Sequence, residues 1–345
     1  MRNILLIAAS AAALAACATG PGPDKVATPN VAMVRETDPV ASIDDAADDP
    51  AIWRNAADPA ASLIVATDKK AGLVTYGLDG KRRDFKPAGR VNNVDLRDGV
   101  TINGQPGVLV VASDRNDPLS GALALFSLAP SGMLTPLGKV AGPAGEAYGV
   151  CMWKAADQSV FAFLVMKDGT IAQIALDASG AAPTGKIVRT LKLATQSEGC
   201  VADDRTGKLY VGEEDVGVWR FDAAPSAPVT ATPFAKVDRV QHFADVEGVA
   251  IAPQGEAGGL LIASSQGDNA FAVYKLEDAS FVGRFRIGGE GSESVQETDG
   301  LELMLGDFGP DFPGGLFIAQ DGDNRPDPQN FKLTSWDRIK AALGL

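Results

Sequence analysis

Residues 63–78 read LIVATDKKAGLVTYGL, and the predicted fold rests on this stretch and its repeats. An apolar run leads into the charged segment DKKAG and is followed by a second apolar run, which is the pattern of two strands joined by a loop. Five later stretches repeat the pattern: residues 108–128, 161–176, 209–221, 260–276 and 316–336. Helical periodicity is nearly absent along the chain, so the sequence predicts an all-β protein.

A shorter apolar segment precedes each of these stretches by roughly twenty residues. The six segments are DDPAIW from residue 48, NNVDLR from 92, YGVCMW from 148, EGCVADD from 198, EGVAIA from 247 and DGLELM from 299. Six units of about fifty residues, each with at least two strands, predict a six-bladed β-propeller with one four-stranded blade per unit. A β-sandwich is the alternative, but it would not place similar chemistry at equivalent positions of six successive units.

Equivalent residues of a propeller form rings around its axis, so the repeat also predicts a site. The first ring, at one mouth of the channel, is expected to contain Asp49, Asn93, Tyr148, Glu198, Glu247 and Asp299. The charged loops form a second ring, which is basic in the first three units (Lys69, Lys70, Arg115 and Lys167) and acidic or polar in the last three (Glu213, Glu214, Gln266 and Asp321).

This segregation of charge indicates a mixed site. Crowded carboxylates repel one another unless they are protonated or bridged by metal, and oxygen ligands without His or Cys suit calcium. The facing Lys and Arg residues suit a phosphate ester. The alternative is that these charged loops are solvated and have no role in a site, although the shared register in six units argues against it. The single histidine, His242, has no partner for a catalytic triad or a zinc site and is expected to be structural or incidental.

Nine ordered motifs carry a family resemblance. DDPAIW, NNVDLR, EGCVADD with the following EED, DVEG, ASSQG, TDG, AQDG, QNFK and a final Trp together resemble the β-propeller phytases, from about residue 36 to residue 336. The resemblance implies a calcium-dependent 3-phytase, a phosphomonoesterase that hydrolyses phytate (myo-inositol hexakisphosphate) with a metal-activated water. The stretch GGEGSESVQETDG from residue 288 follows the family's acidic run only loosely.

The resemblance also implies roles for individual residues. Phosphate would be held by Lys69, Lys70, Arg115, Tyr148 and Lys167, with alignment alone separating Lys69 from Lys70. Several calcium ions, or the attacking water, would be held by Asp49, Glu198, Glu214, Asp245, Glu247, Gln266 and Asp299. Catalysis would depend on Glu214, Glu198, Lys69 and Arg115.

Two other functions fit the same pattern. Another calcium-dependent propeller hydrolase, a lactonase or phosphotriesterase, would need fewer cations facing its substrate. A surface lipoprotein that captures phytate or metal phosphate without catalysis would gain little from the acidic cluster. The fold alone does not distinguish these functions from that of a phytase.

The N-terminal residues predict export. Residues 1–17 have one early positive charge and an apolar run ending in LAAC, which resembles a lipoprotein signal with Cys17 as the lipid attachment site. An ordinary cleaved signal is the alternative. Residues 18–35 are predicted to be a flexible linker and residues 36–345 the propeller domain. The expected location is the cell envelope, facing the periplasm or on the outer membrane, or else outside the cell.

Composition limits the partners. A net charge of −13 argues against nucleic acid and anionic lipid, so membrane contact is expected only through the N-terminal lipid. No feature indicates an oligomer, and a monomer is expected. Cys151 and Cys200 either form a disulfide or remain two buried thiols.

Overall fold

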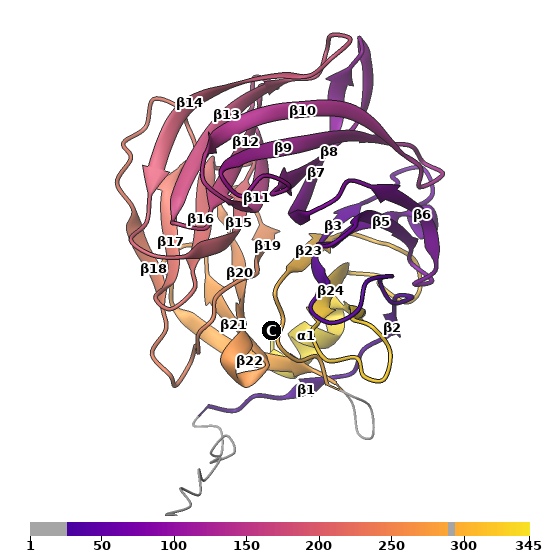
Figure 1. Cartoon of the computed structure of the whole chain (residues 1–345). Helices are drawn as coiled ribbons and strands as arrows, with labels where there is room; N and C mark the ends of the chain where they lie inside the picture. Colours follow the sequence, from indigo (N-terminus) through magenta and orange to yellow (C-terminus); the bar gives the residue numbers. More distant parts are fainter. Residues whose placement is uncertain (1–25, 289–293) are drawn as a thin grey trace, which may run out of the picture.

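Residues 26–288 and 294–345 are described by a computed structural model in which nearly all regular structure is β-strand. Six sheets follow one another around a common axis (Figure 1). The innermost strands of neighbouring sheets contact each other around the whole ring. The predicted six-bladed β-propeller is confirmed.

The first three blades are each built from four consecutive antiparallel strands. Blade 1 contains β3 (Ala47–Trp53), β4 (Leu63–Asp68), β5 (Gly72–Gly77) and β6 (Arg82–Pro87), with the 3₁₀ turn η1 (Pro59–Ala61) between β3 and β4. Blade 2 contains β7 (Val91–Ile102), β8 (Gln105–Asp114), β9 (Ser120–Leu128) and β10 (Leu134–Ala144). Blade 3 contains β11 (Ala147–Lys154), β12 (Val160–Met166), β13 (Thr170–Asp177) and β14 (Thr184–Lys192).

Blade 4 repeats this pattern, whereas blades 5 and 6 each include one strand from the N-terminal end of the chain. Blade 4 contains β15 (Ser197–Asp203), β16 (Lys208–Glu213), β17 (Gly217–Asp222) and β18 (Thr232–Lys236). Blade 5 contains β19 (Val249–Gln254), β20 (Gly258–Ser265), β21 (Ala270–Lys275), β22 (Phe281–Ile287) and β1 (Asn30–Val31), with η2 (Gln266–Asp268) between β20 and β21. Blade 6 contains β23 (Leu301–Leu305), β24 (Gly315–Asp321), β25 (Asn330–Ser335) and β2 (Arg35–Glu36).

The two short N-terminal strands close the ring. β2 pairs antiparallel with β25 and supplies the fourth strand of blade 6, while β1 adds a parallel fifth strand to blade 5. The predicted linker over residues 18–35 is therefore corrected, because residues 30–31 and 35 pair with sheets of the propeller. Such pairing covers strand edges that would otherwise be open. The predicted signal peptide and Cys17 lie outside the described residues.

The core lies between the blades. Buried apolar side chains form six clusters, and each cluster fills the space between two neighbouring blades. Between blades 6 and 1, for example, Tyr76 packs near Phe331, with ring centroids 6.3 Å apart. Packing of this kind makes each blade depend on both neighbours, so the six inner strands are held around the channel as one body.

Two other features complete the fold. The chain ends in α1 (Trp336–Leu343), capped by the Ser335 side chain, which accepts from the Asp337 N–H, and by Gly344, whose φ is 72°. Cys151 on β11 and Cys200 on β15 form a disulfide that links blades 3 and 4. No helix among the described residues has the length and apolar character needed to cross a membrane.

Candidate active site

A cavity of about 500 Å³ lies at one mouth of the channel. It is lined by residues that precede or begin the inner strands and by residues from the adjoining loops. The lining residues are Asp45, Lys69, Tyr148, Glu247, Gln266, Gly267, Asn269, Glu297, Asp299 and Gln329. Acidic, basic and aromatic side chains therefore meet here, and those that were also expected in the two rings are Lys69, Tyr148, Glu247, Gln266 and Asp299.

Three glutamates from blades 4 and 5 converge at this mouth. Glu198 lies on β15, Glu214 follows β16 and Glu247 precedes β19, and each has a carboxylate oxygen within 4.8 Å of the other two. All three are buried, and Glu214 Oε1 has no hydrogen-bond partner. Asn92 Nδ2 donates to Glu198 at 2.6 Å. The three carboxylates form an oxygen cluster with a free acceptor.

Burial makes this cluster costly when it is ionised. Burial raises the pKa of Glu247 to about 12, and the nearby charge on Glu198 adds to the shift. Burial also raises the pKa of Glu198 well above its ordinary value, and the charge of Asp48 raises it further. The pKa of Glu214 is likewise raised by burial. Carboxylates in this arrangement need protons or a cation to share the site. Their hard oxygen donors and the unpartnered Glu214 Oε1 fit a metal ion such as calcium.

Gln266 joins the cluster to the opposite wall of the cavity. Its Nε2 donates to Glu247 Oε2 and, at 2.9 Å, to Asp299 Oδ1. Asp245 lies in the loop before β19, where burial and the charges of Asp215 and Asp299 raise its pKa. Glu247, Gln266 and Asp299 thus lie around one space.

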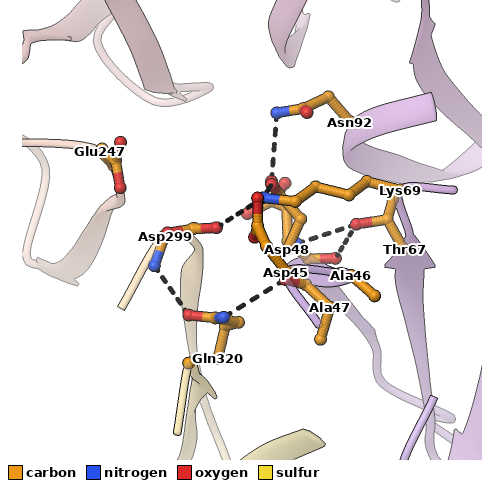
Figure 2. Close-up of polar contacts among 12 residues, drawn as sticks. Asp45, Ala46, Ala47, Asp48, Thr67, Lys69, Asn92, Glu247, Asp299 and Gln320 are labelled. Carbon is orange, nitrogen blue, oxygen red and sulfur yellow. Dashed lines mark hydrogen bonds and ion pairs between the residues drawn. The ribbon is translucent and has the colours of Figure 1, made fainter. Parts of the chain in front are cut away.

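Lys69 is the basic centre of the other wall. Its Nζ lies 2.6 Å from Asp45 Oδ1, 3.0 Å from Asp48 Oδ2 and 2.9 Å from Asp299 Oδ2 (Figure 2). Burial by itself would lower the pKa of Lys69, but the charges of Asp48 and Asp299 outweigh it and raise that pKa. Lys69 is therefore a fixed cation directed into the cavity.

Two further cations lie over the ring of Tyr148. Lys167 Nζ lies 5.0 Å and Arg115 Cζ 5.8 Å from the centroid of the Tyr148 ring, within the range of cation–π contacts. Arg115 Nε is buried without a hydrogen-bond partner, and Arg115 Nη1 lies 3.8 Å from Glu146. Burial raises the pKa of Tyr148, as do the charges of Glu198 and Asp48, so its hydroxyl keeps its proton. These groups can bind an anion beside the acidic cluster.

Comparisons with known proteins agree with this geometry. The family model described as Phytase matches residues 2–345. The chain belongs to the phytase family. It is 39% identical over 326 residues to the 3-phytase of Bacillus subtilis (strain 168), an alignment that covers 90% of this chain and 84% of that protein. The predicted resemblance to the phytases is confirmed.

Asp49, a predicted calcium ligand, lies elsewhere in the channel. Asp49 accepts from the Val94 N–H at 2.9 Å and lines a second cavity of about 470 Å³, deeper in the channel. Its neighbour Asp48 occupies the ring position beside Lys69. Adjacent strand residues point to opposite sides, so a one-residue slip in the predicted register exchanged the two aspartates. By the same slip, Asn92 rather than Asn93 holds the ring position, and it donates to Glu198. The side-chain amide of Asn93 also donates to Glu198 Oε1, at 3.0 Å.

The charged-loop ring also needs correction. Lys70 is exposed and its Nζ donates to the Ile43 carbonyl at 2.6 Å, so the geometry favours Lys69 over Lys70 in the cavity. Glu213 accepts from Thr195 and from Trp219 Nε1, and it supports blade 4 rather than the cavity. Asp321 lies 3.3 Å from Lys332 Nζ, inside blade 6.

Asp45, Asp48 and Asn92 were missed by sequence reasoning. If the first residues of DDPAIW and NNVDLR are aligned with the Glu of EGC, Asp48 and Asn92 take the ring positions. Asp45 lies in an irregular segment before β3, where the repeat gives no alignment. His242 is fully buried, with Nε2 2.8 Å from the Ser264 carbonyl oxygen and Nδ1 3.3 Å from Tyr274 Oη. These contacts give it a structural role.

Proposed function

We propose that this chain is a calcium-dependent phosphomonoesterase that removes phosphate groups from phytate. The observation that carries the proposal is the meeting, at one mouth, of a buried carboxylate cluster and three cationic side chains. The similarity to a relative named 3-phytase supports the choice of substrate. A polyanion needs both halves of such a site, because the carboxylates alone would repel it.

The proposed calcium ligands are the three clustered glutamates and the polar residues around them. Glu198, Glu214 and Glu247 would hold calcium, and Glu214 Oε1 is a buried acceptor ready for it. The next candidates around them are Asp48, Asp245, Gln266 and Asp299. Calcium bound here would lower the pKa of a water molecule and neutralise charge on phosphate oxygens.

The basic residues would bind and orient the substrate. Arg115 and Lys167 both lie over the Tyr148 ring, and their charges can offset those on the equatorial oxygens of the phosphoryl group. Lys69 can turn its Nζ to a phosphate oxygen once Asp299 has another positive partner. The Tyr148 hydroxyl, which keeps its proton, can donate a hydrogen bond to the same group.

We also propose that the protein is exported and anchored by a lipid on Cys17. The disulfide between Cys151 and Cys200 supports this, because such bonds persist in oxidising compartments.

The proposed activity can be tested with a small set of substrates. Purified protein without residues 1–17, at neutral pH with calcium, is expected to release phosphate from phytate and to leave a lactone and a phosphotriester intact. Turnover of the lactone or the phosphotriester in preference to phytate would move the assignment to another propeller hydrolase. Tight phytate binding by folded protein without phosphate release would support the capture protein instead.

A further inference from the structure

Gln320 connects two blades beneath the site. It lies on β24 and is fully buried. Its Oε1 accepts from the Asp299 N–H at 2.8 Å, and its Nε2 donates to the Ala47 carbonyl oxygen at 3.2 Å (Figure 2). Asp299 precedes the inner strand of blade 6 and Ala47 begins the inner strand of blade 1. One amide group therefore spans the junction between these blades.

This junction is where the two ends of the chain meet to close the ring. The Gly300 N–H donates to the Asp48 carbonyl oxygen at 3.1 Å, directly beside the Gln320 bridge. A Cβ on Gly300 would lie 2.4 Å from Asp49 Oδ1 and 2.6 Å from the Asp48 carbonyl oxygen, so the two backbones are closely packed. The ion pair of Lys69 with Asp299 crosses the same junction.

The equivalent position in other blades holds a shorter side chain. The register of the inner strands pairs Leu301 with Ala319 in blade 6, and the residue after this partner is Gln320. The corresponding residues of the other five blades are Thr67, Ser113, Val165, Gly212 and Ser264. Thr67, Ser113 and Ser264 each accept from a backbone N–H of their own blade, as Gln320 does.

Gln320 differs from these residues in its reach. The hydroxyls of Thr67 and Ser264 make their described contacts within one blade, and Ser113 Oγ reaches the next blade by donating to the Tyr148 carbonyl oxygen at 2.5 Å. Gln320 uses separate donor and acceptor atoms for the two blades, so it can fix both backbones at once.

We propose that Gln320 is a positioning residue for the active site. It does not line the cavity. It sets the backbone of Asp299 against blade 1, so that the Asp299 carboxylate reaches both Lys69 Nζ at 2.9 Å and Gln266 Nε2 at 2.9 Å. The inference rests on the proposed function, since Asp299 and Lys69 are assigned there to the calcium and phosphate sites.

The test is Gln320→Met, which keeps the length of the side chain and removes both hydrogen bonds. Gln320→Glu is the second variant, because it retains an acceptor for the Asp299 N–H. The matched control is Gln173→Met, which removes a fully buried amide that bonds Arg189 and the Ala223 carbonyl oxygen, all outside the proposed site. Each protein is measured for its calcium midpoint, defined as the free calcium concentration at half saturation of the folded protein in isothermal titration calorimetry, and for kcat and KM with phytate.

The loss of these hydrogen bonds should raise the calcium midpoint and KM of Q320M about fivefold to tenfold. Q320E should show a smaller increase. Q173M should have a lower Tm but keep the wild-type calcium midpoint and KM, because a lower fraction of folded enzyme changes only the apparent kcat.

Three results would overturn the inference. They are wild-type calcium midpoint and KM in Q320M, equal changes in Q320M and Q173M, and failure of the wild-type protein to bind calcium. If the wild type binds calcium but releases no phosphate, the proposed function fails while the calcium midpoints of the variants still decide the role of Gln320.

Discussion

Replacing Glu214 with Gln tests the acidic cluster most sharply. The substitution keeps the shape of the side chain and removes one of three buried charges whose oxygens lie within 4.8 Å of one another. At an effective dielectric constant of about 20, each pair of ionised groups at this distance repels by about 3 kcal/mol. Because the pKa of Glu247 is raised to about 12, protons already relieve part of this repulsion without calcium. The expected gain in unfolding free energy for the calcium-free variant is therefore about 1–3 kcal/mol, or roughly 2–6 °C in Tm.

In the presence of calcium, we expect E214Q to be less stable than the wild type. E214Q should show a much smaller calcium-induced rise in Tm than the wild type, and phosphate release from phytate should fall by about a hundredfold or more. Differential scanning calorimetry with calcium or chelator, together with a phosphate assay, measures both effects. Glu213→Gln is the matched control, because Glu213 is also buried but accepts hydrogen bonds from Thr195 and Trp219. The reasoning is refuted if E214Q keeps its activity and calcium response, or if E213Q loses its calcium response to the same extent.

Three further predictions concern residues outside the acidic cluster. Lys69→Ala should lower kcat/KM for phytate by about a hundredfold or more, whereas Lys70→Ala should stay within about threefold of wild type; equal losses would contradict the separation of these lysines. Burial lowers the pKa of His242 to about 4 from 6.5, so wild-type stability should fall by roughly 3 kcal/mol as pH drops from 6.5 to 4, and His242→Gln should lack this part of the pH dependence in urea unfolding. Replacing Cys151 and Cys200 together by Ala opens a loop with a separation of 49 residues and should lower the free energy of unfolding by about 4 kcal/mol; an unchanged urea midpoint would contradict this.

Much of the fold was predictable because a propeller repeats its pattern. Each unit shows the strand, charged loop and return strand, and that register placed Glu198, Glu247 and Asp299 at one mouth. The closing strands were not predictable in the same way. β1 and β2 are two residues each, and nothing in so short a segment shows that it completes a blade formed some 250 to 300 residues later.

The errors within the site have specific physical causes. Asp48 and Asp49 are adjacent and chemically identical, so only the exact strand register decides which one faces Lys69. Lys69 and Lys70 differ in the direction of their side chains within one turn, which sequence does not specify. Gln320 was invisible as a site residue because its contribution consists of two backbone contacts on different blades.

We propose above that the mouth of the channel hydrolyses phytate only when calcium occupies its carboxylates. The most direct measurement is the initial rate of phosphate release from phytate as free calcium is raised from zero, in excess chelator, to saturation. Our proposal predicts no release without calcium and a saturable rise in rate as free calcium increases. Undiminished release in excess chelator would contradict it.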